Sequence, residues 1–214
     1  MRIHDYPGFP NPFRVRAALA EKGMAKDVEF VLVDLPAAEH KQPPFLTINQ
    51  EGTVPVLELD DGTFISEVTA ITEYLDNLDG KPTLFGKTPK EKGVIHMMQK
   101  RGERELLYAA GNYFHYGTPG GSPILAQYKL PHWKARGEWA EMERDRSVEG
   151  MRYFDRVLST QPYVAGDSFS AADITVYAGL LFADAGKIAI PRELKSLIQW
   201  RQRLSERPSV KNPA

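Results

Sequence analysis

Two hydrophobic patterns divide the chain into a mixed N-terminal part and a helical C-terminal part. Short runs rich in β-branched and apolar residues predict strands at Met1–Tyr6, Val28–Val33, Val54–Leu59 and Thr63–Ser66, the last two joined by an Asp61-Gly62 turn. Apolar residues at helical spacing predict helices at Phe13–Lys22, which ends before Gly23, and at Glu67–Leu78. The predicted order is β-α-β, an irregular segment, then β-β-α.

The second part begins after Asp79–Pro89, a stretch dense in glycine, proline, lysine and threonine. Helical patterns follow at Lys90–Tyr116, Trp133–Thr160, Ala171–Ala185 and Glu193–Arg207, and the glycine-rich run Gly117–Pro123 separates the first two. We see no further strand pattern. We therefore expect an α/β domain over residues 1–80, a linker over 81–89 and an all-helical domain over 90–214.

Composition narrows the classes of function. In 214 residues, Lys+Arg 27 against Asp+Glu 28 leave a net charge of -1, which argues against a nucleic-acid partner. Because the chain has 0 cysteines, it has no disulfide, thiolate metal site or cysteine nucleophile. The 5 histidines form no HxxxH or HExxH pair, so we expect no metal. We see neither a signal peptide nor an apolar run of about 18 residues, and expect a cytoplasmic protein without a membrane partner.

Three motifs allow both a structural and a functional interpretation. Pro55 lies in an apolar run; a trans bond is the commoner form, whereas a cis bond would turn neighbouring backbone groups toward a peptide-like ligand. Glu67 precedes a helix whose first amides suit either simple capping or an anion. Ser170 and Asp173 form a variant capping box, and losing the Ser170 cap should cost about 1 kcal/mol.

Aromatic and polar residues gather before the glycine-rich break, in the run Asn112-Tyr113-Phe114-His115-Tyr116. Such a cluster is either buried packing or the lining of a cleft, and the residues alone leave both interpretations open.

Three stretches of the chain resemble the cytosolic glutathione transferases. Thr53–Asp76 is similar to that family's V-P-x-L, D-G and E-S-x-A-I-x-x-Y-L pattern, and Pro12–Gly23 resembles its first helix. Tyr163–Val176 resembles its buried capping box with a hydrophobic staple. The resemblance covers nearly the whole chain. It implies a thioredoxin-like N-terminal domain with a cis-proline, an all-α C-terminal helical-bundle domain, and a homodimer.

The resemblance also implies a set of glutathione-binding residues. The Val54 backbone beside cis-Pro55 should pair with the cysteinyl part of glutathione, and Glu67 with the amide of Val68 should hold the γ-glutamyl end. Three residues are candidates for the glycine carboxylate, namely His40, Lys41 and Gln50. We prefer Lys41, because a carboxylate favours a cation.

The chain departs from the family pattern where the thiol is activated. Phe9 stands in place of the usual serine or cysteine, and Tyr6 lies out of register with the tyrosine of other members. The sequence most resembles an atypical fungal and bacterial group without that side chain, in which a bound water and polar residues of the helical domain are implied to deprotonate the thiol. We expect the helix start at Asn11 and a water held by His115 to take this role, with Tyr6 as the alternative.

The resemblance thus implies an enzyme, a glutathione S-transferase of detoxification that conjugates the glutathione thiolate to hydrophobic electrophiles. We expect the acceptor site to be lined by Phe9, Asn112, Tyr113, Phe114 and Tyr116. The alternative is a non-catalytic protein of the same fold that binds glutathione or another ligand. Thiol exchange through an enzyme cysteine is excluded, because the chain has none.

Overall fold

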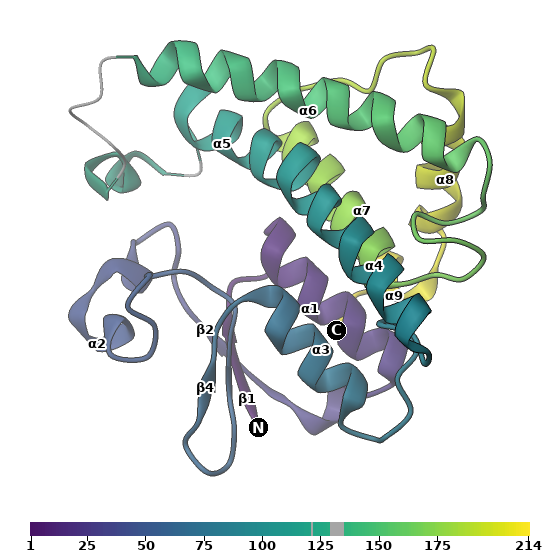
Figure 1. Cartoon of the computed structure of the whole chain (residues 1–214). Helices are drawn as coiled ribbons and strands as arrows, with labels where there is room; N and C mark the ends of the chain where they lie inside the picture. Colours follow the sequence, from purple (N-terminus) through teal and green to yellow (C-terminus); the bar gives the residue numbers. More distant parts are fainter. Residues whose placement is uncertain (121, 129–134) are drawn as a thin grey trace.

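The computed structural model describes residues 1–120, 122–128 and 135–214, and it places a small sheet beside a bundle of helices (Figure 1). Strand β1 (Arg2–Asp5) lies parallel to β2 (Glu29–Leu32) and antiparallel to β3 (Val56–Glu58). Strand β4 (Phe64–Ile65) pairs antiparallel with β3, so the strand order is β2-β1-β3-β4. Together with its helices this sheet confirms the predicted thioredoxin-like fold of the N-terminal part.

Consecutive residues of β3 point to opposite faces of the sheet and meet different layers. Leu57 packs with Ile3 under the two helices on one face, α1 (Pro10–Lys22) and α3 (Val68–Asn77). Val56 packs on the other face with Phe45 of the short helix α2 (Pro43–Leu46). The predicted irregular segment therefore contains the 3₁₀ turn η2 (Glu39–Lys41) followed by α2, whereas the 3₁₀ turn η1 (Ala25–Asp27) lies before β2.

Helix α1 begins three residues before the predicted start at Phe13. Pro10 and Pro12 lie in its first turn, where proline is tolerated because the amide N–H groups there have no helical acceptor. Gly23 ends the helix with a φ of 68°, a conformation that favours glycine. Strand β3 is shorter than predicted, since it begins after Pro55, which has no N–H for the ladder.

The C-terminal part is built from helices and has no strand of two or more residues among its described residues, which confirms the predicted fold class. Its helices are α4 (Pro89–Gly102), α5 (Tyr108–Gly117), α6 (Arg136–Leu158), α7 (Ala171–Ala185), α8 (Lys195–Ser205) and α9 (Pro208–Lys211). The segment between α5 and α6 contains the 3₁₀ turn η4 (Pro123–Tyr128). The predicted helix start at Trp133 lies outside the described residues. Helix α7 runs through the middle of this domain and also contacts α1 (Figure 1).

The single helix predicted over Lys90–Tyr116 is interrupted by a π-helical turn, η3 (Glu103–Leu107). Two glycines make room for this wider turn. A Cβ at Gly150 of α6 would lie 2.3 Å from the carbonyl oxygen of Glu105, and one at Gly179 of α7 would lie 2.7 Å from the Leu106 side chain. The π turn therefore depends on close helix packing rather than on a local sequence signal.

A capping box starts α7 as predicted and connects it to two other segments. Asp173 accepts hydrogen bonds from the Ser170 N–H (3.0 Å) and the Ser170 hydroxyl (3.0 Å). The same carboxylate accepts the Val164 N–H (2.9 Å) and the Trp200 indole N–H (3.1 Å). Asp173 is completely buried, so these donors have no access to water as a substitute.

Within the described residues, no helix has both the length and the apolar character that crossing a membrane requires.

We predict that Asp173→Ala lowers the free energy of unfolding by about 3 kcal/mol, because four buried donors lose their acceptor. Chemical denaturation followed by circular dichroism measures the loss. Asp167→Ala, at an exposed position in the preceding loop, is the matched control and should change stability little. Equal stability of the two variants would contradict this role of Asp173.

Candidate functional site

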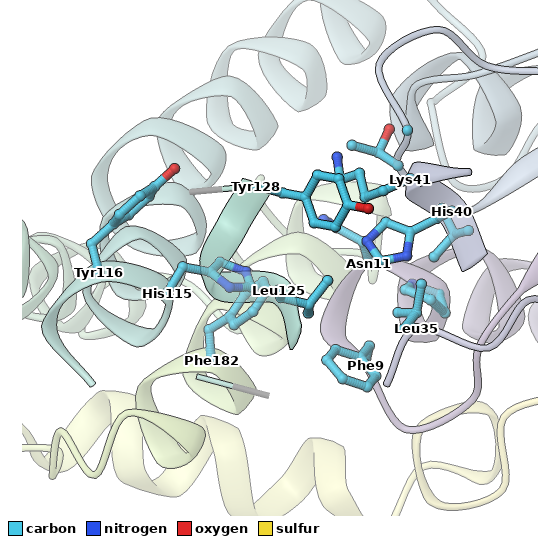
Figure 2. Close-up of a pocket in the computed structure, with 14 residues that line it drawn as sticks. Phe9, Asn11, Leu35, His40, Lys41, His115, Tyr116, Leu125, Tyr128 and Phe182 are labelled. Atoms are coloured by element: carbon cyan, nitrogen blue, oxygen red, sulfur yellow. The ribbon is translucent and has the colours of Figure 1, made fainter. Parts of the chain in front are cut away.

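A cavity of about 330 Å³ lies where the two domains meet (Figure 2). Its volume falls in the range of small-molecule sites, which hold about 300–1,000 Å³. The described residues that line it are Phe9, Asn11, Pro12, Leu35, His40, Lys41, Gly52, Thr53, Val54, His115, Tyr116, Leu125, Tyr128 and Phe182. The first nine come from the sheet domain and the last five from the helical domain, so the cavity exists only where both domains are in place.

The start of α1 forms one end of the cavity and has few hydrogen-bond donors. A helix leaves its first four amide N–H groups without helical acceptors, but Pro10 and Pro12 have no N–H. The backbone donors that remain in this first turn are those of Phe9 and Asn11. Phe9 has no side-chain oxygen to cap the helix, so these N–H groups and the positive end of the helix dipole favour an anion here.

A buried ion pair lies directly behind this helix start. Arg14 Nη2 donates to Glu103 Oε1 at 2.8 Å, and the Thr69 hydroxyl donates to the same oxygen at 2.9 Å. Burial alone would raise the pKa of the Glu103 carboxyl, but Arg14 and these hydrogen bonds outweigh it and hold that pKa below its usual range. Arg14 Nη1 also donates to Asn11 Oδ1 at 3.4 Å, which leaves the Asn11 amide nitrogen as a donor.

Two basic side chains line the cavity on the side of the sheet domain. Burial lowers the pKa of the His40 imidazole to about 4, and the neighbouring Lys41 cation acts in the same direction. His40 Nδ1 is buried and has no hydrogen-bond partner in the described part of the chain. Lys41 Nζ donates to the Glu51 carbonyl oxygen at 3.2 Å, and burial lowers the pKa of its amine. At neutral pH the pair is one uncharged imidazole beside one cation.

The backbone beside these residues takes two unusual conformations. The Val54–Pro55 peptide bond, for which the family resemblance implies the cis form, is cis in the structure. Gly52 has a φ of 57°, and a Cβ there would lie 2.7 Å from the His40 carbonyl oxygen. Glycine at this position therefore allows the Gly52–Val54 segment to pack against the segment that contains His40 and Lys41.

The helical domain supplies an aromatic wall. The His115 ring lies edge-on to Phe182, with ring centroids 6.0 Å apart, and edge-on to Phe114 at 5.0 Å. Figure 2 shows His115 beside Phe182 on the side of the cavity opposite Phe9 and Leu35. The His115 imidazole thus lies in the aromatic, apolar part of the cavity beside Phe182, while the Lys41 cation lies in the polar part beside His40.

Three of the residues predicted for the acceptor wall point elsewhere. Asn112 Nδ2 donates to Glu143 Oε2 of α6 at 2.7 Å. Tyr113 packs against Gly117, where an added Cβ would lie 2.5 Å from its ring. Phe114 packs on Phe182, at a centroid distance of 6.1 Å. Successive helix positions turn by about 100°, so of this run only residues 115 and 116 reach the cavity.

The other predicted site residues do not line the cavity. Tyr6 packs edge-on against Phe9, with centroids 5.6 Å apart. Gln50 is exposed. Glu67 is also exposed and has a φ of 68° at the start of α3, whereas Val68 and Pro55 are buried. The structure thus brings Phe9, Asn11, His40, Lys41, Val54, His115 and Tyr116 together and places the remaining predicted residues around them.

Seven lining residues were not among the predicted site residues, namely Pro12, Leu35, Gly52, Thr53, Leu125, Tyr128 and Phe182. Phe182 belongs to a helix that looks uniformly apolar, and Leu125 and Tyr128 follow the glycine-rich break. The sequence contains no local signal that any of these side chains reaches a site. Among the described residues, no group of three or more histidine, aspartate or glutamate side chains is arranged to hold a metal ion.

Comparison with protein families identifies the chain. Residues 10–78 match the model of the glutathione S-transferase N-terminal domain, and residues 126–208 match that of the C-terminal domain. The chain is 57% identical to glutathione S-transferase 2 of Saccharomyces cerevisiae over 99% of its own length and 88% of that protein. This chain belongs to the glutathione S-transferase family. The prediction that it is an enzyme, a glutathione transferase, is thereby confirmed.

Solved structures agree with this assignment. The crystal structure of Gtt2 from Saccharomyces cerevisiae superposes with a TM-score of 0.94 at 57% identity, covering 99% of both chains. A glutathione S-transferase domain-containing protein of Marinobacter aquaeolei superposes with a TM-score of 0.92 at 47% identity, covering 98% of this chain and 100% of that one. This glutathione transferase therefore has the family fold over nearly its whole length.

We predict that His40 makes the stability of this transferase depend on pH. The folded pKa of about 4 lies below the unfolded value of about 6.5, so the unfolded chain binds more protons between these values. The contribution of His40 to the free energy of unfolding is fully present above a pH of about 6.5 and is lost as the pH falls toward about 4. The test is denaturant unfolding at pH values between about 7.5 and 5, which bracket the pKa of the unfolded histidine by about one pH unit. The free energy of unfolding should depend less on pH in His40→Asn than in the unsubstituted protein. His96→Asn is the control, and an unchanged slope for His40→Asn would contradict the prediction.

Proposed function

We propose that this transferase conjugates glutathione to small hydrophobic electrophiles without a hydroxyl or thiol side chain to activate the sulfur. The observation that carries the proposal is the cavity itself. It combines the donor-bearing start of α1, the backbone at Val54 and the aromatic wall with His115, while Phe9 occupies the place of the usual serine or cysteine.

Glutathione would lie along the side of the sheet domain. The Val54 backbone would pair with its cysteinyl part, and Lys41 would hold the glycine carboxylate beside the neutral His40 ring. Glu67 and the Val68 amide would hold the γ-glutamyl end at the start of α3. Lys41 is supported over Gln50 because it lines the cavity and carries charge, whereas Gln50 is exposed and outside the lining.

The thiol would then reach the start of α1. A free thiol has a pKa of about 8.5, so little of it is ionised at neutral pH unless the site favours the anion. The N–H groups of Phe9 and Asn11, the Asn11 side-chain amide and the helix dipole are the available sources of stabilisation. His115 would take the proton through a bridging water, since a neutral imidazole is an acceptor near neutral pH.

A non-catalytic glutathione-binding protein is the second candidate. The observation that favours it is Phe9, whose side chain can neither donate a hydrogen bond nor accept a proton. We also propose a homodimer located in the cytoplasm and acting in detoxification; these proposals rest on the resemblance to the family.

We predict that Glu67→Ala and Lys41→Met each weaken glutathione binding by about tenfold or more, because each removes one charged partner of a charge-assisted hydrogen bond. Isothermal titration calorimetry with glutathione measures the change. Lys26→Met, at an exposed position of η1, is the control for the lost charge. Unchanged affinity in both variants would mean that glutathione lies elsewhere.

We predict that His115→Ala lowers kcat/KM for conjugation by about tenfold, whereas Tyr6→Phe retains most of the activity. A general base contributes about 10²–10⁴-fold, and the start of α1 would still favour the thiolate in the variant. The pH dependence of kcat/KM should shift toward higher pH in His115→Ala. The opposite result, with loss of activity in Tyr6→Phe alone, would identify a tyrosine-type enzyme.

A further inference from the structure

The segment between α5 and α6 reaches the thioredoxin-like domain at two points. The Ser122 hydroxyl donates to the Pro36 carbonyl oxygen at 2.9 Å. Further along, Gln42 Nε2 donates to the Tyr128 hydroxyl oxygen at 3.2 Å. Between these contacts lies η4, which Figure 1 shows above the loop that leads into α2 and separate from the packed helices. We call residues 122–128 the strap.

Both ends of the strap are hydrogen-bonded to residues that lie next to the cavity lining. Pro36 follows Leu35, and Gln42 follows Lys41; Leu35 and Lys41 both line the cavity. From the strap itself, Leu125 and Tyr128 line it (Figure 2). The strap therefore supplies a wall of the cavity, and the two hydrogen bonds determine how far that wall lies from the sheet domain.

Little apolar burial holds the strap in place. No residue of η4 is buried, and Ile124 and Tyr128 are 46% and 43% exposed. The facing wall differs, because Phe182 is 7% exposed and belongs to a core helix. Segments with few buried apolar contacts open at low free-energy cost. A single hydrogen bond is therefore a substantial part of what keeps the strap closed.

We propose that the Gln42–Tyr128 hydrogen bond sets the size of electrophile that the transferase accepts, with Gln42 as a positioning residue and Tyr128 as a specificity-determining residue. When the bond is made, Tyr128 and Leu125 close the apolar part of the cavity, and a small electrophile fits. When it is broken, the wall can move outward and a bulkier electrophile can enter. This proposal rests on the proposed conjugation activity.

The test compares two electrophiles of the same chemistry, benzyl isothiocyanate and 1-naphthylmethyl isothiocyanate. Gln42→Ala and Tyr128→Phe each remove the hydrogen bond, and the loss of one neutral hydrogen bond changes an equilibrium by about two- to tenfold. We expect the ratio of kcat/KM for the larger over the smaller probe to rise by about that factor in each variant. The double variant should show no further rise, because both changes remove the same contact. Gln127→Ala, at an exposed position of the strap, should leave the ratio unchanged.

A second measurement follows the strap without glutathione. Amide hydrogen exchange in the peptide covering residues 122–128 of the free protein should be faster in Gln42→Ala and Tyr128→Phe than in Gln127→Ala. Gln42 does not line the cavity, so a ratio that changes only in Tyr128→Phe would mean that the hydroxyl contacts the electrophile directly, and the proposal would be wrong. Unchanged exchange in both variants would also overturn it.

The failure of the proposed function would be seen separately. If the unsubstituted protein conjugated neither probe, the proposed function would be wrong, and so would the selection of electrophiles by size. Hydrogen exchange would still show whether the Gln42–Tyr128 hydrogen bond holds the strap.

Discussion

The ion pair between Arg14 and Glu103 joins the two domains at the point on which the site depends. Both side chains are almost fully buried, and Thr69 of α3 donates to the same carboxylate oxygen. Removing one partner of a buried pair typically costs about 3–5 kcal/mol, because the other charge is left without compensation. The pair therefore fixes α1 and α3 of the sheet domain against the helical domain. It thereby fixes the nine cavity-lining residues of the sheet domain relative to the five of the helical domain.

The π turn explains how Glu103 comes to this position. It lies where α4 passes into α5, and Gly150 and Gly179 allow that turn to pack closely against α6 and α7. Helix α5 then brings His115 and Tyr116 to the cavity. The same packing thus places the acceptor of the ion pair and the aromatic wall, although they lie more than two helical turns apart.

Local sequence signals predicted the elements whose ends are determined by short-range chemistry. Helix α7 begins and ends at the predicted residues, and its start is determined by the cap that Ser170 and Asp173 form. The start of α1 was missed by three residues, because prolines that break a helix interior are tolerated in its first turn. The interruption of the helix at Glu103–Leu107 could not be predicted, since its cause lies in glycines of two other helices.

The residues of the site likewise divide into those that the sequence could predict and those that it could not. Val54 could be named because the family pattern over Thr53–Asp76 contains it, and His40 and Lys41 were named as candidates for the glycine carboxylate that the resemblance implies. The structure brings all three into one lining. Phe182, Leu125 and Tyr128 could not, because they reach the cavity only through the packing of distant segments. The Asn112-Tyr113-Phe114 run was assigned to the cavity by its composition, yet the helix turns these side chains toward α6 and the core.

We propose that this transferase ionises the glutathione thiol although Phe9 provides no hydroxyl or thiol. Pro10 and Pro12 reduce the backbone donors at the start of α1, so the Asn11 side-chain amide, oriented by Arg14, would be the main side-chain donor to the sulfur. The most direct measurement is the ultraviolet absorbance of the thiolate of glutathione bound to the unsubstituted protein, titrated against pH, with S-methylglutathione as the blank. We expect half-ionisation at a pH clearly below the ordinary thiol pKa of about 8.5. Bound glutathione that ionises at the same pH as free glutathione would contradict it.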